Sequence, residues 1–274
     1  MSNITASDVN KLRKSTGAGI MDCKKALVEA NGDFDLAIEN LRKKGQKVAA
    51  KRADRDSSEG AVIAKVNDAN DTGIIISLNC ETDFVAKNES FVALANQIAT
   101  IALSANTKDE LLSSDFENMT VQEKLIEQTG VIGEKLEIGS FERISSEFVG
   151  SYIHAGNKIA TIVGLSNSFD GASEVAKNVS MQAAAMNPVA LDESGVSKDV
   201  IEKEIEIAKD QLRAEGKPEA MLDNIAKGKL KKFFKENTLV NQAFIKDNKL
   251  SVNDYIKSVN SECSITDFKR SALV

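Results

Sequence analysis

Residues 60–66, GAVIAKV, and residues 73–78, GIIISL, are two short apolar runs on either side of a polar turn around Asp71 and Thr72. Runs of this length that are rich in valine and isoleucine are typical of β-strands, so we predict an antiparallel hairpin. Beyond it, apolar residues recur three and four positions apart, which predicts a helix packed against the hairpin. The side chains that this helix should bury are Phe91, Leu94, Ala95, Ile98 and Ala102. Locally paired strands covered by a helix indicate an α+β fold with antiparallel sheets.

A similar order of elements returns after Gly150. Residues 151–165, SYIHAGNKIATIVGL, predict a second hairpin, and residues 172–186 predict the helix that follows it. One face of that helix should carry Val175, Val179, Gln182 and Met186. We interpret the two copies as a divergent duplication that forms a two-part core. The other core elements expected are a helix near 121–131 and strands at 136–149, 240–245 and 265–268.

Residues 5–44 are typical of three short helices. Gly17 and Gly19 separate the first helix from the second, and residues 31–33, NGD, end the second and cap the third. The apolar residues expected inside this three-helix bundle are Val9, Leu12, Ala26, Leu27, Ala30, Phe34, Ala37, Ile38 and Leu41. Residues 46–59 are rich in Lys, Arg, Asp and Ser, and we expect a linker or an exposed helix there.

Residues 198–237 show a different pattern, in which apolar positions step by four, three and four, the spacing of a coiled-coil seam. These positions are Ile201, Ile205, Ala208 and Leu212. Residues 216–218, GKP, then reverse the chain. We predict a projecting antiparallel helical hairpin inserted into the core, in preference to two ordinary core helices, because charged residues surround the narrow seam. The sequence leaves open whether this hairpin contacts a partner, pairs two copies as a homodimer, or fills space.

With 42% hydrophobic and 28% charged residues, the 274-residue chain has the composition of an ordinary globular protein. The patterns above divide it into consecutive units. They are the three-helix bundle with its linker (1–56), a first core subdomain (57–148), the first part of a second core subdomain (149–196), the helical hairpin (197–237) and the return of the second subdomain (238–274).

The sequence gives little support to an enzyme. It lacks the Gly-x-x-x-x-Gly-Lys-Ser/Thr loop that holds nucleotide phosphates, and the pair Gly17 and Gly19 follows a helix, whereas a dinucleotide fingerprint follows a strand. His154 is the only histidine, so a metal site built on two histidines is impossible. The three cysteines are odd in number and far apart, which favours reduced thiols: Cys23, Cys80 and Cys263. We expect no catalytic residues, no cofactor and no metal site.

The first residues, MSNITASDVN, do not combine a basic segment with an apolar one. No run of about 18 apolar residues occurs in the sequence either. We therefore predict neither a signal peptide nor a membrane span, and we expect a cytoplasmic protein.

Residues 81–88, ETDFVAKN, place one aromatic residue among polar ones, between a predicted strand and a predicted helix. From the residues alone, the favoured interpretation is that Phe84 is the first apolar residue of that helix. Thr82 or Asp83 would then cap the helix by accepting free backbone N–H groups. In the alternative interpretation, Phe84 projects from the surface.

Five spaced motifs resemble elongation factor Ts, in the order found in that family and along nearly the whole chain. They are LRKSTGAGIMDCKKAL from Leu12, NCETDFVAKN from Asn79, VIGEKLEI from Val131, GSYIHAGNKIA from Gly150, and the GKP turn followed by GKLKKFF from Gly228. The resemblance implies a ubiquitin-associated-like N-terminal bundle, a two-part α+β core and a helical hairpin. It also implies a guanine nucleotide exchange factor of translation elongation, which makes elongation factor Tu release GDP and take up GTP. Such a protein is not an enzyme and needs no nucleotide, nucleic acid or membrane site of its own.

The same resemblance assigns roles to residues. The loop of Thr82, Asp83, Phe84 and Val85 matches the segment that inserts an aromatic side chain between helices of the partner's G domain and disturbs the partner's Mg²⁺ site. Ile20 stands where relatives often carry methionine, a change that keeps an apolar contact. The further positions that match partner contacts are Arg13, Ile20, Met21, Lys24, Ile132, Gly133 and His154.

Two other classes of protein are alternatives to an exchange factor. Net charge is −6, yet between Lys11 and Arg55 twelve basic residues oppose six acidic ones, so a basic RNA-binding protein that uses the bundle is the alternative. Few aromatic residues accompany those charges, which weakens this alternative. An enzyme that handles phosphate through Asp83 and a metal would need a second acidic ligand at a suitable spacing, and the sequence offers none.

Overall fold

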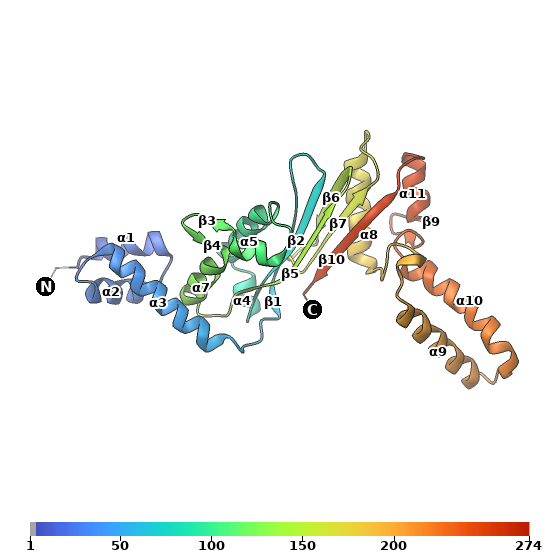
Figure 1. Cartoon of the computed structure of the whole chain (residues 1–274), viewed down its shortest axis with the longest axis horizontal. Helices are drawn as coiled ribbons and strands as arrows, with labels where there is room; N and C mark the ends of the chain where they lie inside the picture. The colour runs from blue at the N-terminus through green and yellow to red at the C-terminus, as the bar shows by residue number, and fades with distance from the viewer. Residues whose placement is uncertain (1–3, 274) are drawn as a thin grey trace.

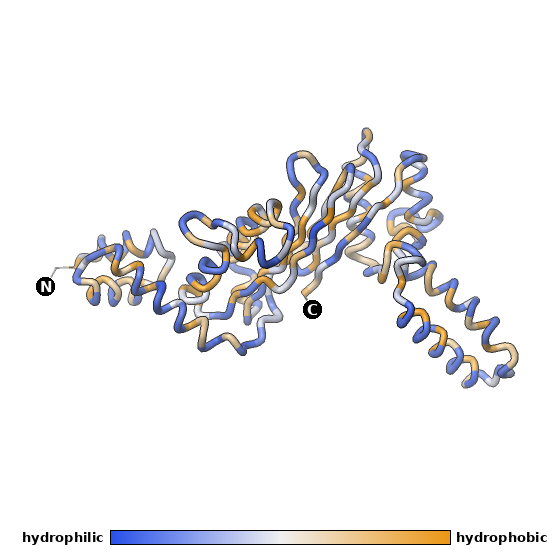
Figure 2. Tube along the Cα trace, viewed as in Figure 1, coloured by the Kyte–Doolittle hydropathy of each residue, from blue (hydrophilic) through white to orange (hydrophobic). Residues whose placement is uncertain are grey.

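The computed structural model describes residues 4–273. Residues 1–3 and residue 274, which the first and last predicted units include, lie outside the described residues. The molecule is elongated, with a helical bundle at one end, two β-sheets in the middle and a helical hairpin that extends from the other end (Figure 1). Hydrophobic and hydrophilic residues are interspersed along the chain (Figure 2). Within residues 4–273, no helix has both the length and the apolar composition needed to cross a membrane.

The first three helices pack around a buried cluster, as predicted. They are α1 (Ala6–Thr16), α2 (Ile20–Glu29) and α3 (Phe34–Arg52), and they bury Val9, Leu12, Cys23, Ala26, Leu27 and Ala37. Thr5 forms a capping box with Asp8 at the start of α1, and Gly17 ends that helix at a φ of 71°, which glycine adopts readily. Because α3 continues to Arg52, the expected linker is helical in its first half.

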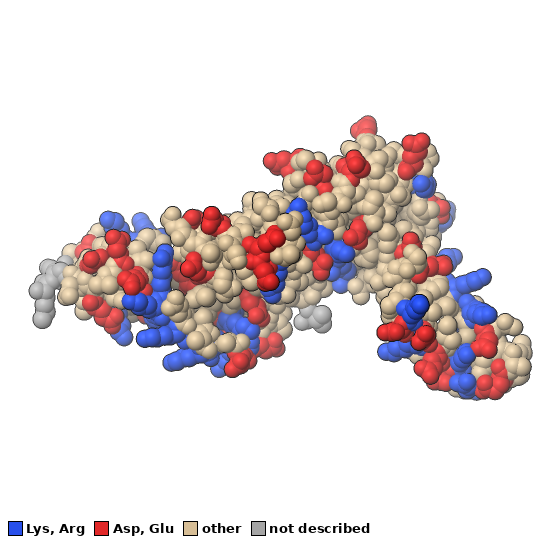
Figure 3. Space-filling model, in the orientation of Figure 1, with Lys and Arg blue, Asp and Glu red and all other residues tan. Residues whose placement is uncertain are grey.

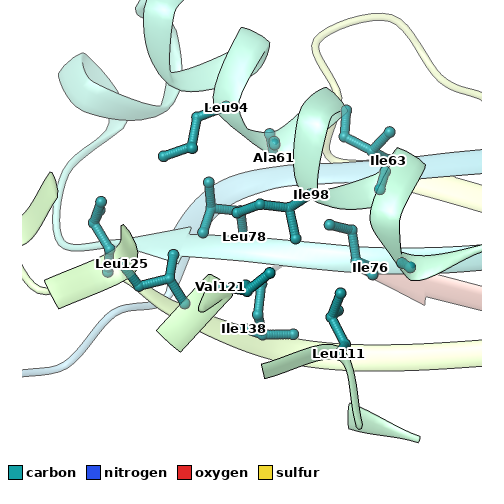
Figure 4. Packing of buried hydrophobic residues seen from close by; sticks show 14 of the residues in the cluster. Ala61, Ile63, Ile76, Leu78, Leu94, Ile98, Leu111, Val121, Leu125 and Ile138 are labelled. Atoms are coloured by element: carbon teal, nitrogen blue, oxygen red, sulfur yellow. The ribbon is translucent and has the colours of Figure 1, made fainter. Parts of the chain in front are cut away.

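The first core sheet contains the predicted hairpin. β1 (Glu59–Val66) pairs with β2 (Thr72–Cys80), and β5 (Glu137–Ser145) joins the other side of β2. One face is covered by α5 (Glu89–Ala102) and α7 (Val121–Ile132), together with α4 (Asp83–Ala86), α6 (Lys108–Ser113), β3 (Asp115–Phe116) and β4 (Met119–Thr120). All five side chains that α5 was predicted to bury are buried. Figure 4 shows Ile98 of α5 beside Leu78 of β2 in this core.

The second sheet has the same kind of arrangement. β6 (Phe148–Ile153) and β7 (Ile159–Leu165) form the predicted hairpin, and β10 (Ile265–Ala272) pairs with the other side of β7. α8 (Ala172–Met186) packs on this sheet. Two further elements pack into its core, β8 (Ala243–Phe244) and α11 (Val252–Val259), and β9 (Asp247–Ser251) pairs with β8.

The two sheets lie face to face. In β2, Ile74 and Ile76 belong to the core under the helices, whereas Ile75 belongs to a cluster between the sheets. The other buried members of that second cluster are Val62, Ala64, Ile144, Val149, Ala160 and Ile162. Burial on both faces explains why the strands read as continuous apolar runs in the sequence. The resulting order of layers is helix, sheet, sheet, helix.

α9 (Lys198–Ala214) and α10 (Glu219–Asn237) pack together as the predicted hairpin, which follows the short 3₁₀ turn η1 (Glu193–Gly195). The chain reverses at Gly216, which has a φ of 73°. Of the predicted seam residues, Ala208 and Leu212 are buried. Lys209 pairs with Asp223 across the two helices, with Nζ and Oδ1 2.6 Å apart.

The segment 136–149, predicted as one strand, is in fact two strands in different sheets. β5 ends at Ser145 and β6 begins at Phe148. Between them, the Ser146 hydroxyl donates to the Leu165 carbonyl at 2.6 Å, which fixes the point where the chain passes from one sheet to the other.

The prediction of a strand at 240–245 is also largely wrong. The backbone N–H groups of Asn241 and Gln242 both donate to the Thr238 carbonyl, so this stretch is mostly a turn, and only Ala243–Phe244 is a strand. Met186, expected on the buried face of its helix, is 48% exposed. It is the last residue of α8.

Candidate functional site

The loop predicted to meet the partner forms the single-turn helix α4 between β2 and α5. Thr82 caps this turn, because its hydroxyl oxygen accepts the backbone N–H of Val85 at 3.4 Å. Val85 packs against the first core cluster and Ala86 is buried, but Phe84 is 84% exposed. Thr82 therefore caps a separate turn, whereas the helix that it was predicted to cap, α5, is capped by Asn88. The interpretation of Phe84 as the first apolar residue of that helix is wrong. The loop is anchored on one side and displays its aromatic ring on the other.

Asp83 forms an ion pair with Lys87, one turn along the chain, with Oδ2 and Nζ 2.6 Å apart. The hydrogen bond from Lys87 lowers the pKa of the Asp83 carboxyl, and the same bond raises the pKa of Lys87. Among the described residues, no group of three or more His, Cys, Asp or Glu side chains is arranged to hold a metal ion.

Two glutamates beside the loop, Glu81 and Glu134, each accept hydrogen bonds from the chain segment that carries the other. The Glu134 carboxylate accepts the backbone N–H groups of Glu81 (3.1 Å) and Thr82 (3.0 Å) and the Thr82 hydroxyl (2.7 Å). The Glu81 carboxylate accepts the backbone N–H of Lys135 (2.7 Å) and Nη1 of Arg52 (2.7 and 2.8 Å). Partial burial acts to raise the pKa of Glu81, but the bonds from Lys135 and Arg52 outweigh it and lower that pKa. Sequence reasoning missed these residues as parts of the site.

Ile132 and Gly133 lie where α7 ends and therefore directly before Glu134. Ile132 packs against the first core cluster. Gly133 ends the helix in the left-handed region at a φ of 84°, and no atom lies within 4 Å of where its side chain would be. Through Glu134, these two residues are held next to the loop.

His154 is exposed at the start of the turn that joins β6 to β7, and its Nδ1 lies 3.1 Å from the Tyr152 hydroxyl. Lys158, at the end of that turn, pairs with Glu59. Glu59 stands opposite Cys80 in the first sheet, and Cys80 comes two residues before Thr82. The His154 turn and the loop therefore approach the same end of that sheet.

The four bundle residues are all exposed: Arg13, Ile20, Met21 and Lys24. They lie on α1 and α2, whose buried residues form a hydrophobic cluster separate from the one under the loop, and α7 contributes residues to both clusters. Val131, near the end of α7, packs against the bundle cluster and lines a small cavity together with Ala18. Successive residues of one segment thus touch the bundle, the core and the loop.

Known proteins of one family are similar to this chain over most of its length. A family model described as Elongation factor TS matches residues 81–273. The chain is 68% identical over 273 residues to Elongation factor Ts of Christiangramia forsetii and 66% identical to that of Flavobacterium psychrophilum, in both cases across the full length of the two chains. It is 53% identical to Elongation factor Ts of Amoebophilus asiaticus, over 97% of this chain and 98% of the relative. The chain therefore belongs to the elongation factor Ts family.

Proposed function

We propose that this chain drives nucleotide exchange by inserting the loop of Thr82, Asp83, Phe84 and Val85 into elongation factor Tu. Membership of the elongation factor Ts family makes it a guanine nucleotide exchange factor for that GTPase in protein biosynthesis. It binds the GDP form, disturbs the partner's Mg²⁺ and nucleotide site, and promotes replacement of GDP by GTP. The observation that supports this use of the loop is the 84% exposure of Phe84 on an otherwise anchored turn.

The energetics require contacts beyond the loop. Burying one phenylalanine contributes about 1.5 to 3 kcal/mol. A ten-thousandfold shift between two states of the partner requires about 5.5 kcal/mol of differential binding. Ile20 and Met21, 52% and 73% exposed on the bundle, offer apolar area for the remainder. Arg13, Lys24, Ile132, Gly133 and His154 complete the proposed contact surface.

Exchange of this kind involves no covalent chemistry in the chain itself. The Mg²⁺ and the nucleotide belong to the partner, and coupling between sites is reciprocal, so bound GDP must in turn weaken the grip of the exchange factor. We infer that the chain works in the cytoplasm, where its partner is found, without a cofactor.

The arrangement of elements also supports the finer architecture inferred from the sequence. Each sheet consists of a hairpin and a third strand from later in the chain, with the strand orders β1-β2-β5 and β6-β7-β10. In each case a helix that follows the hairpin packs on the sheet. We infer that the two sheets arose by duplication, that the bundle is a ubiquitin-associated-like module, and that the unit boundaries lie near residues 56, 148, 196 and 237.

Ion pairs on the bundle favour a nucleotide exchange factor over an RNA-binding protein. Lys and Arg side chains gather along one side of the bundle in Figure 3. However, Lys44 pairs with Asp22 and Lys43 with Glu39, so acidic neighbours offset part of this positive charge. An RNA surface would need these charges free to face phosphate groups.

The test is the release rate of a fluorescent GDP analogue from elongation factor Tu at fixed Mg²⁺. Phe84→Ala should lower the rate of stimulated release by about 10- to 150-fold, which is 1.5 to 3 kcal/mol of lost contact. The melting temperature should stay unchanged because the ring is exposed in the free chain. Val259→Ala, which trims a 48% exposed apolar side chain on α11, is the matched control and should exchange normally. Unchanged release with Phe84→Ala would move the mechanism to other contacts.

A further inference from the structure

The carboxylate of Glu134 is fully occupied with the segment that leads into the loop. Its Oε2 accepts two successive backbone N–H groups, those of Glu81 and Thr82, and its Oε1 accepts the Thr82 hydroxyl at 2.7 Å. Hydrogen bonds to an ionised acceptor are stronger than neutral ones, and three converge here on one side chain. Glu134 follows the left-handed Gly133, so its position is set by the end of α7.

The Thr82 hydroxyl has one proton, and that proton goes to Glu134. Its oxygen is then left to accept the N–H of Val85, which caps the turn that carries Phe84. The bond to Glu134 thus fixes both the side-chain rotamer of Thr82 and the direction of α4.

A second carboxylate extends this contact toward the bundle. Glu81 accepts two bonds from Arg52, in the last turn of α3, and one from the backbone of Lys135. The two glutamates therefore bind each other's chain segments, and the loop is tied both to the end of α7 and to the helix that leaves the bundle.

We propose that Glu134 is a positioning residue for exchange, which holds the loop so that Phe84 meets the partner in one orientation. This inference rests on the proposed function of the loop. Glu134 acts through Thr82 and α4, with Arg52 and Glu81 coupling the same loop to the bundle.

The test is a double-mutant cycle in the GDP-release assay, with Glu134→Ala made in the natural chain and in the Phe84→Ala chain. Glu134→Ala should slow stimulated release about tenfold in the natural chain and have almost no effect once Phe84 is absent, because the two substitutions remove the same contribution. Glu134→Gln, which keeps one acceptor oxygen, should show an intermediate loss. A merely structural role would slow both chains equally.

Amide hydrogen exchange reports the loop directly. The N–H groups of Glu81 and Thr82 should lose their protection from exchange in Glu134→Ala and lose part of it in Glu134→Gln. In Phe84→Ala the same two N–H groups should stay protected. Asp254→Ala is the matched control, since Asp254 likewise accepts a backbone N–H and a hydroxyl, both from Ser251, but does so on α11. It should leave GDP release unchanged.

The outcomes separate the two proposals. If Phe84→Ala slows release but Glu134→Ala slows both chains by the same factor, the positioning role is overturned and the loop insertion stands. If Phe84→Ala leaves release unchanged, the loop insertion is overturned, and the positioning role with it. Protected Glu81 and Thr82 amides in Glu134→Ala would also overturn the positioning role.

Discussion

The bundle and the core meet where α3 crosses α7, and two glycines form that crossing. A methyl group added at Gly130 would lie 2.5 Å from the Cα of Gly45 and 3.2 Å from its nitrogen. Carbon atoms in comfortable contact lie about 3.5 to 4 Å apart, so the substitution Gly130→Ala must push the helices apart by about 1 Å or bend one of them. Overpacking of this kind costs about 1 to 3 kcal/mol. Alanine in place of glycine inside a helix stabilises the folded chain by up to about 1 kcal/mol, which offsets part of this cost.

Gly228→Ala separates these two effects. Gly228 lies inside α10, and no atom is within 4 Å of the added methyl group, so only the helix preference changes and the variant should be stabilised by up to about 1 kcal/mol. The free energies of unfolding of the two variants should therefore differ by about 1 to 3 kcal/mol, with Gly130→Ala the less stable.

Urea unfolding gives the difference between the variants, and amide hydrogen exchange gives its location. We expect faster exchange in α3 and α7 of Gly130→Ala and unchanged exchange in the second sheet, because the bundle and the two sheets bury separate clusters. If Gly130→Ala were as stable as Gly228→Ala, the close crossing would not exist and the link between bundle and core would have to lie elsewhere.

Three further results should follow from burial and charge. Phe91→Ala should cost about 3 to 5 kcal/mol in urea unfolding, because the ring is 1% exposed in the first core; a loss below 1 kcal/mol would contradict that packing. Burial raises the pKa of Cys80 to about 12, so at pH 8 a maleimide should label Cys80 about a thousandfold more slowly in the folded chain than in the urea-unfolded chain, and equal rates at Cys80 would refute the burial. Because the pKa of Glu81 is lowered in the folded chain, its carboxylate stabilises the fold above the unfolded pKa near 4.5, and this stability is lost as the pH falls through the folded pKa. Arg52→Gln should weaken this dependence of the unfolding free energy on acid pH. An identical pH dependence in the variant would exclude the ion pair of Arg52 and Glu81 as its source.

The parts of the fold that depend on neighbouring residues could be predicted from the sequence. Both hairpins, the first three helices and the hairpin of α9 and α10 are set by turns and apolar spacing. The third strand of each sheet was harder, because β5 and β10 pair with strands far away in the chain. In the sequence 136–149 the division falls at the polar residues 145–147, SSE, but polar residues also occur within its first half, so these three did not stand out and only the meeting of two sheets divides the segment.

The candidate site divides in the same way. Capping by Thr82 is a local effect and was predicted, but for α5 and not for the separate turn α4 that it caps. The exposure of Phe84 depends on what α4 packs against, and the ordinary pattern favoured a buried ring. Glu134 could not be found, because a carboxylate that accepts backbone N–H groups 52 and 53 positions away looks the same in the sequence as one in water.

Rigidity of the loop decides whether an exposed aromatic side chain can drive exchange at all. Ordering the backbone of one residue costs about 1 to 2 kcal/mol, so a free four-residue loop would need about 4 to 8 kcal/mol on binding. Burying Phe84 contributes only about 1.5 to 3 kcal/mol, so a mobile loop would gain nothing from it. The cap by Thr82, the packing of Val85 and the bonds to Glu134 all exist in the free chain, and the ordering cost is therefore met during folding. It follows that a variant that loosens the loop should lose part or all of what the ring contributes to exchange, but no more than a variant that removes the ring.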